Sequence, residues 1–321
     1  MRNNSSEPRN VYLKAIFRRS LMNQIMVLSF IALIFFSFSC YANPKSHGGE
    51  EAHEETSSTE DGEGELIPTS LEQSKLQLLI NKLASGNDTS NVGGINAVSM
   101  IIDKAEELNR GLGKGGILEI GSGYGSAANY IYKLGFKDIQ GIEINKDALD
   151  YARLHYPHIV FDEVDALKTT KFFKEDTFSL IYMINVYSEI YDPAVLIQKT
   201  KNICAKDGII AIFDYSTTKD LGANTFTFSD GSKINAIKLD ELEIFFKIAR
   251  IEKLAVIDVS EIYQDWYQKL IDDIAAKRSL IIAGNEFTGP ELTFVANYYK
   301  KMLDLFKEKK ISGTLIIAKK L

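Results

Sequence analysis

One stretch, GILEIGSGYGSAANY at residues 116–130, constrains the fold of this chain more than any other. An apolar run with a single acid, Glu119, leads directly into a glycine-rich turn. The glycines stand at alternate positions, Gly121, Gly123 and Gly125, and two alanines with high helix propensity follow. This order predicts a strand, a tight loop and a helix N-terminus, which is how α/β proteins commonly hold a nucleotide.

Strand and helix patterns alternate along the rest of the chain. Such alternation predicts right-handed βαβ units and a parallel sheet that helices cover on both faces. We therefore expect a doubly wound α/β fold with a seven-stranded, mostly parallel sheet and a helical insertion, about 263–309, before the last strand. The expected strands are 117–120, 139–144, 159–161, 178–184, 209–213, 254–259 and 313–318, and the expected helices are 71–83, 96–109, 127–134, 146–155, 193–203, 239–249, 263–283 and 290–309.

The N-terminus has the pattern of a leader. Basic residues precede an uncharged stretch whose apolar heart is 25–38, and the tripeptide CYA at 40–42 offers a small-x-small cleavage site. This predicts a signal peptide over residues 1–42 and an exported protein, periplasmic or secreted. One alternative is an uncleaved membrane anchor over residues 21–42, through which alone we expect contact with a membrane. Another is a lipoprotein cysteine at Cys40.

An acidic segment separates the leader from the folded part. Residues 43–65 are rich in acidic residues, glycine and serine and have no large apolar side chain, so we expect a disordered linker there and one folded domain over 66–321. The formal net charge of −6 argues against a nucleic-acid partner. No cluster of cysteine and histidine has the spacing of metal ligands, so we expect no metal.

Three acidic residues in the alternating strands and helices indicate which kind of ligand the glycine loop binds. Glu119, two residues before the first glycine, suits a cationic ligand that carries an amino acid better than a pyrophosphate. Glu143 ends the second expected strand, where its carboxylate can accept hydrogen bonds from both hydroxyls of a ribose. Asp165 follows the third strand, where it can accept a hydrogen bond from an adenine amino group. The glycines allow the backbone to approach such a ligand, because a Cβ atom would collide with it.

Together these segments resemble the class I S-adenosylmethionine-dependent methyltransferases. The matching pieces are ILEIGSGYG, the acid Glu143, Asp165-Ala166, FSLIYMINVYSEIYDP and KDGIIAIFDYS, in that order over residues 117–216. The resemblance implies S-adenosyl-L-methionine as cofactor, with the glycine loop around its amino-acid part and Asn185 beside the methyl-bearing sulfur. The cofactor-binding residues that it implies are Glu119, Gly121, Ser122, Gly123, Tyr124, Gly125, Glu143, Ile144, Asp165, Ala166 and Asn185.

The C-terminal third resembles small-molecule methyltransferases, among them the phosphoethanolamine and sarcosine N-methyltransferases and the cyclopropane-fatty-acid group. The resemblance implies that the insertion roofs the pocket of a small-molecule acceptor. Tyr187, Glu189 and Asp214 are the candidate catalytic residues, and a base is needed only if the acceptor arrives protonated. The aromatic residues of the insertion either pack in the core or face the acceptor: Tyr263, Trp266, Tyr267, Phe287, Phe294, Tyr298 and Tyr299.

The expected function is therefore the transfer of a methyl group from S-adenosylmethionine to a small molecule. Two alternatives stay open. One is an exported, methyltransferase-like binding protein without turnover, because the leader would carry the chain away from the cytosol, where the cofactor is made. The other is a nicotinamide-dependent dehydrogenase, which rests on the glycine loop alone.

Overall fold

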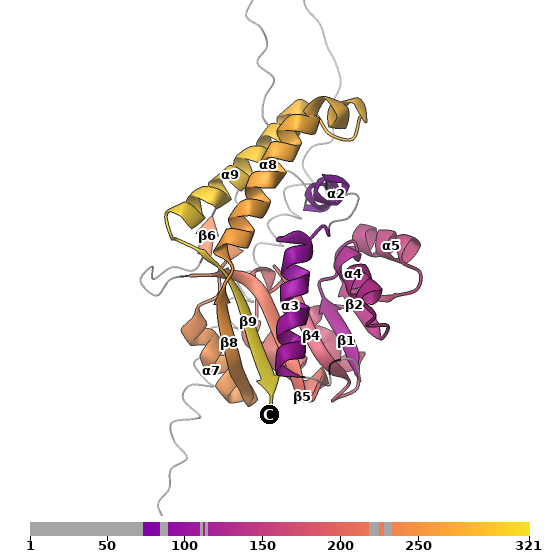
Figure 1. Ribbon diagram of the computed structural model, residues 1–321, viewed down its shortest axis with the longest axis vertical. Helices are drawn as coiled ribbons and strands as arrows, with labels where there is room; N and C mark the ends of the chain where they lie inside the picture. The colour runs from indigo at the N-terminus through magenta and orange to yellow at the C-terminus, as the bar shows by residue number, and fades with distance from the viewer. Residues whose placement is uncertain (1–72, 84–88, 110–111, 113–114, 218–224, 228–232) are drawn as a thin grey trace, which may run out of the picture. The chain divides into compact units, whose positions relative to one another are not determined.

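The computed structural model of this protein describes residues 73–83, 89–109, 112, 115–217, 225–227 and 233–321, all within one compact unit of the chain, Gly64–Leu321 (Figure 1). The expected signal peptide or anchor and the expected linker, residues 1–65, lie outside the described residues, so both stay predictions. No helix among the described residues is long and apolar enough to cross a bilayer.

One sheet organises the described residues. Its strands are β1 (Gly116–Ile120), β2 (Ile139–Glu143), β3 (Val160–Glu163), β4 (Phe178–Ile184), β5 (Cys204–Ser216), β8 (Ile251–Asp258) and β9 (Ser312–Lys320). They lie in the order β3-β2-β1-β4-β5-β9-β8. The first five are parallel to one another, whereas β9 runs antiparallel to both β5 and β8. The prediction of a seven-stranded, mostly parallel sheet is confirmed.

Helices connect the strands, and some of them begin at a side-chain cap. The side chain of Asn145 accepts hydrogen bonds from two backbone N–H groups of the helix that follows it, and Thr288 and Glu291 form a capping box. The helices are α2 (Gln73–Leu83), α3 (Gly94–Leu108), α4 (Ser126–Leu134), α5 (Lys146–His155), α6 (Pro193–Ile203), α7 (Leu239–Ala249), α8 (Ser260–Ala283) and α9 (Gly289–Lys307), with the short 3-10 helices η2 (Ala166–Lys171) and η3 (Tyr187–Glu189).

The central strands are buried on both faces, which explains why they read as continuous apolar runs. Successive residues of a strand point to opposite faces, so Ile117 packs in the core with α3, α4, α8 and α9, whereas Leu118 packs with α6 and α7. Glu119 therefore lies on the same face of the sheet as Ile117. The glycine loop thus lies between helices and strands that are packed on both faces of the sheet.

The insertion stands at the carboxyl end of the parallel strands. Helix α8 begins at Ser260, directly after β8 ends, and α9 returns the chain to β9. Figure 1 shows α8 and α9 side by side, rising beyond the sheet from the ends of β8 and β9. A small two-stranded sheet, β6 (Thr225–Thr227) and β7 (Lys233–Asn235), was not predicted, because strands of three mostly polar residues give no periodic signal.

Candidate functional site

The glycine loop connects β1 to α4, and all three of its alternating glycines have a left-handed φ: 72° at Gly121, 50° at Gly123 and 79° at Gly125. A Cβ atom at Gly121 would collide with Val186, and one at Gly125 would come within 2.7 Å of Phe161. By contrast, no atom lies within 4 Å of the place where a Cβ of Gly123 would be. Gly121 and Gly125 thus serve packing, whereas Gly123 borders open space that a ligand can enter.

Glu119 points from the strand toward the first turn of α4. Its side chain is only 3% exposed, and it lies beside Tyr182, its register partner on β4, and near the backbone N–H of Ala128. The Oε2 atom has no hydrogen-bond partner among the described residues, and the same holds for the buried hydroxyl of Ser122. Burial raises the pKa of Glu119 to about 8. The nearby Tyr182 hydroxyl and Ala128 N–H act in the opposite direction on this pKa. A buried acceptor of this kind can accept a hydrogen bond from a ligand.

Glu143 ties the loop to the second strand. Its Oε2 accepts a hydrogen bond from the N–H of Gly123 at 2.8 Å, and its Oε1 accepts from the N–H groups of Ile144 and Asn145, each at 2.8 Å. A carboxylate can accept about four hydrogen bonds, so one position is left for a ribose hydroxyl. The side chain of Ile144 is 69% exposed, and its N–H helps to hold the carboxylate of Glu143. Tyr124 is buried with its ring edge-on to Tyr151.

Asp165 lies one strand further along the same edge. Its Oδ1 accepts a hydrogen bond from the N–H of Leu167 at 2.9 Å, and its Oδ2 pairs with Lys168 at 3.0 Å. The residue therefore caps η2, whose first residue is the buried Ala166. This strand end adjoins Glu143, because the N–H of Val164 donates to the backbone oxygen of Glu143 at 3.3 Å. The fold thus gathers the glycine loop, both glutamates and Asp165 at one edge of the sheet.

Asn185 ends β4 in a left-handed conformation, with φ of 54°. Its N–H donates to the backbone oxygen of Phe213 at 2.9 Å, and its Oδ1 accepts a hydrogen bond from the Tyr263 hydroxyl at 3.2 Å. The Nδ2 atom is buried without a partner among the described residues. Asparagine tolerates this strained backbone better than most residues, and strain of this kind is often found at functional sites.

The candidate catalytic residues take different positions. Asp214 on β5 is fully buried and accepts hydrogen bonds from the N–H groups of Ser188, at 3.0 Å, and Tyr215, at 2.7 Å. Burial raises the pKa of Asp214 to about 7, although these hydrogen bonds act in the opposite direction. Tyr187 is buried in η3, and burial raises the pKa of its phenol. Glu189, at the end of η3, is exposed.

A polar segment before α3, which was not among the residues predicted from the sequence, adjoins the glycine loop at the start of α4. The N–H and the hydroxyl of Ser90 each lie 2.9 Å from the hydroxyl of Ser126, the first residue of α4. Asn91 donates through Nδ2 to the backbone oxygens of Val92 and Gly94, and its Oδ1 is buried without a partner among the described residues. The run DTSNVGG, between two helical patterns, was the only signal in the sequence.

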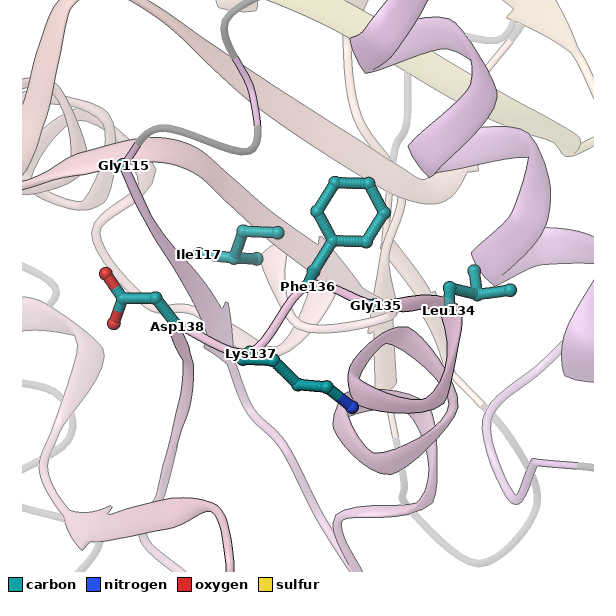
Figure 2. A pocket seen from close by; sticks show the side chains of 7 residues that line it. All are labelled: Gly115, Ile117, Leu134, Gly135, Phe136, Lys137 and Asp138. Carbon is teal, nitrogen blue, oxygen red and sulfur yellow. The ribbon is translucent and has the colours of Figure 1, made fainter.

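Two pockets elsewhere among the described residues are not lined by the glycine loop. Figure 2 shows the first, of about 280 Å³, where Gly115 leads into β1 and the turn at residues 134–138 connects α4 to β2. This is the amino end of both strands, opposite the loop. The acidic Asp138 and the basic Lys137 point apart there (Figure 2). The second hollow, of about 530 Å³, lies between α7 and the edge strand β8.

The residues at the glycine loop fit a nucleoside that carries an amino acid. The unpartnered Oε2 of Glu119 can accept from an ammonium group, Gly123 leaves room beside the backbone, and Glu143 keeps one position for a hydroxyl. Among the described residues, no group of three or more histidine, cysteine, aspartate or glutamate side chains could hold a metal ion. The donors and acceptors at the glycine loop suit an organic ligand.

Comparisons with known proteins agree with this geometry. The fold is that of class I methyltransferases. Residues 90–247 match the family described as "Methyltransferase domain". No curated protein matches the sequence.

Solved structures share the fold at low sequence identity. Phosphoethanolamine N-methyltransferase 2 of Haemonchus contortus has a TM-score of 0.64 at 15% identity, over 77% of this chain and 58% of that one, so this chain spans less than two thirds of that enzyme. The [4+2]-cyclase SpnF has a TM-score of 0.61 at 18% identity, over 77% and 93% of the two chains. A putative sarcosine dimethylglycine methyltransferase from Galdieria sulphuraria has a TM-score of 0.60 at 11% identity, over 70% and 85%.

Proposed function

We propose that this protein binds S-adenosylmethionine at the glycine loop and transfers its methyl group to a small molecule. The observation that carries the proposal is Glu119, a carboxyl group with an unpartnered oxygen inside the fold, at the point where the loop is open beside Gly123. A buried carboxyl group is costly unless it meets a hydrogen-bond donor or a cation. An amino-acid ammonium group supplies both.

S-adenosylmethionine, when bound, supplies a methyl group on a positively charged sulfur. The residues of this chain would bind and orient the cofactor and the acceptor, and they would exclude water from the site. Glu119 would hold the ammonium group, Glu143 a ribose hydroxyl, and Asp165 the adenine amino group. Asp165 would have to make that bond in addition to its contacts with Leu167 and Lys168. The glycine loop would bring backbone N–H groups close to the carboxylate of the cofactor.

The acceptor would lie on the other side of Asn185, where β4 and β5 end below α8. Asp214 is placed there with a pKa of about 7, so it can hold or take a proton near neutral pH. It would serve as a base only for an acceptor that arrives protonated. A small-molecule acceptor is supported by two structural neighbours of low sequence identity, a phosphoethanolamine N-methyltransferase and a putative sarcosine dimethylglycine methyltransferase.

The test is a turnover assay on the full-length protein. We expect S-adenosylhomocysteine to accumulate when the protein is incubated with S-adenosylmethionine and a mixed pool of small amines and alcohols, followed by mass spectrometry. The Glu119→Ala variant should lower the rate at least about tenfold, because one charge-assisted hydrogen bond contributes about 1.5–3 kcal/mol. Product at no more than the level without protein would contradict the proposal.

A second candidate is a binding protein without turnover. Its support is the leader pattern at residues 1–42, which would separate the chain from the cytosolic supply of cofactor. The [4+2]-cyclase among the structural neighbours carries a name other than methyltransferase. Binding of S-adenosylhomocysteine without product from any acceptor pool would favour this candidate.

A further inference from the structure

We propose that the groove between α7 and the edge strand β8 binds a small organic anion, a carboxylate that carries an apolar chain. The groove has a volume of about 530 Å³ and is lined by the second half of α7, the start of β8 and Leu321. Pockets that bind small molecules commonly have volumes of about 300–1,000 Å³. This inference goes beyond the proposed function and does not depend on it.

The groove lies at the opposite end of the sheet from the glycine loop. Strand β8 runs in the same direction as β5, because β9 is antiparallel to both. Ile251, the first residue of β8, therefore lies at the amino end of the parallel strands, whereas the glycine loop follows the carboxyl end of β1. Figure 1 shows α7 beside β8, at the end of the sheet away from the insertion. A ligand in the groove would not compete with one at the glycine loop.

The floor of the groove is apolar. Phe246 of α7 and Ile251 of β8 line it, and their side chains are only 2% and 5% exposed. Leu321 lines it as well, with 62% of its side chain exposed. An apolar chain that covered these side chains would remove apolar surface from water, which is favourable.

The apolar surface continues along β8. Val256 pairs with Ile316 of β9, which packs in the core with α6 and α7, so Val256 faces the same side of the sheet. The side chain of Ile316 is fully buried, whereas that of Val256, on the edge strand, is 43% exposed. A chain that starts in the groove can therefore extend over Val256.

The charged side chains around the groove are mostly basic. Glu243, Lys247 and Arg250 follow one another on one face of α7, and Lys253 lines the groove from β8. Glu243 pairs with Lys253 at 2.8 Å. Lys247 and Arg250 form no ion pair with another described residue. If a carboxylate at Leu321 is counted too, the lining has three cations against two anions, an excess that one monoanion would neutralise.

The backbone at this end of α7 is engaged in hydrogen bonds. A helix C-terminus carries partial negative charge, which by itself disfavours an anion. Here the N–H of Arg250 donates to the backbone oxygens of Lys247 and Phe246, and the N–H of Leu321 donates to that of Arg250 at 3.3 Å. The unpaired side-chain cations therefore determine the charge that a ligand meets in the groove.

The two unpaired cations suit a carboxylate. The planar guanidinium of arginine can donate two parallel hydrogen bonds to a carboxylate, and lysine adds a point charge. Lys247 and Arg250 are three residues apart on the helix, where like charges repel each other unless an anion lies between them. The head group of the ligand would contact these two side chains, and its chain would lie on the apolar floor.

Three probes separate the contribution of the charge from that of the chain. The full-length protein is titrated with octanoate, octanol and butyrate by ligand-observed NMR. We expect octanoate to bind at least about fivefold more tightly than octanol, which has no charge, because the cations are exposed to solvent. Butyrate, which is shorter by four methylene groups, should bind at least about tenfold more weakly than octanoate. Equal binding of octanol or of butyrate, or no binding of octanoate, would overturn the inference.

A double variant and a matched control locate the site. Lys247→Gln with Arg250→Gln removes both unpaired cations, and Lys133→Gln removes an exposed lysine from the last turn of α4. With circular dichroism to establish that each protein is folded, we expect the double variant to lose affinity for octanoate at least about fivefold and to bind octanol unchanged. Lys133→Gln should bind octanoate like the wild type. An equal loss in both proteins, or no loss in the double variant, would overturn the placement in this groove.

Discussion

At the scale of single residues, we expect Glu119 to make ligand binding depend on pH. With a pKa of about 8, its carboxyl group is mostly protonated at neutral pH in the free protein. An ammonium group binds the ionised form better, so binding should release a proton. We expect the affinity for S-adenosylhomocysteine to rise up to about tenfold per pH unit between pH 6 and 8 and then to level off. Calorimetry in buffers of different ionisation enthalpy measures the proton release directly.

Glu119→Gln is the control, since it keeps the shape and cannot ionise. Its affinity should be lower and nearly independent of pH over the same range. A variant with the same pH dependence as the wild type would show that another group titrates.

The same residue affects the stability of the free protein. Folding raises the pKa of Glu119 from 4.5 to about 8, so the stability that the protonated group contributes is complete below pH 4.5 and is lost as the pH rises through 8. We expect the melting temperature of the wild type, relative to that of Glu119→Gln, to fall as the pH rises from 5 to 9. Thermal melts of both proteins across this pH range measure the effect. A difference in melting temperature that does not change with pH would contradict the buried position of the carboxyl group.

Two glycines of the loop should respond differently to alanine. Both have left-handed φ, which costs alanine about 1–2 kcal/mol. Gly121→Ala also brings its Cβ onto Val186, so it should lower the stability further, whereas the Cβ of Gly123→Ala enters open space. We expect Gly123→Ala to fold with a modest loss and to bind S-adenosylhomocysteine more weakly. Urea unfolding measures the loss of stability, and calorimetry measures the loss of ligand affinity. Equal stability of the two variants would contradict the packing role assigned to Gly121.

At the scale of elements, Gly313 on β9 determines how closely α8 packs. A Cβ atom there would collide with the ring of Tyr263. Gly313→Ala should therefore move α8 away from Asn185 and lower the stability by about 1–3 kcal/mol. Gly284→Ala is the matched control, because Gly284, at the end of α8, has an ordinary helical φ of −74° and more room. Urea denaturation of both variants tests this, and an equal loss would show that the contact with Tyr263 is not the cause.

The elements that the sequence predicted well are those with a long apolar pattern. Strands β1 and β4 are buried on both faces, so each gives a continuous apolar run that predicts a strand. Strand β1 is followed by the glycines that the loop requires. Asn91 was missed because nothing in a short polar run indicates that the segment folds back onto α4. The capping role of Asp165 was missed as well, because a local hydrogen bond to Leu167 competes with the ligand contact that its position suggests.

At the scale of the whole molecule, the leader that the sequence predicts at residues 1–42 would decide where the protein acts. We expect mass spectrometry of the protein from fractionated cells to find a new N-terminus after Ala42 in the exported fraction, because small residues precede a cleavage site there. An intact N-terminus in the membrane fraction would instead indicate an anchor over residues 21–42. Unprocessed protein in the cytosolic fraction would contradict both the signal peptide and the anchor. The protein would then lie in the compartment where the cofactor is made.

We propose above all that the loop between β1 and α4 holds S-adenosylmethionine through Glu119. Calorimetric titration of the full-length protein with S-adenosylhomocysteine at pH 8 tests it most directly, with circular dichroism to establish that each sample is folded. We expect one site per chain, and a loss of affinity of at least about tenfold in folded Glu119→Ala. No heat of binding to the folded wild type, or an unchanged affinity of the variant, would contradict the claim.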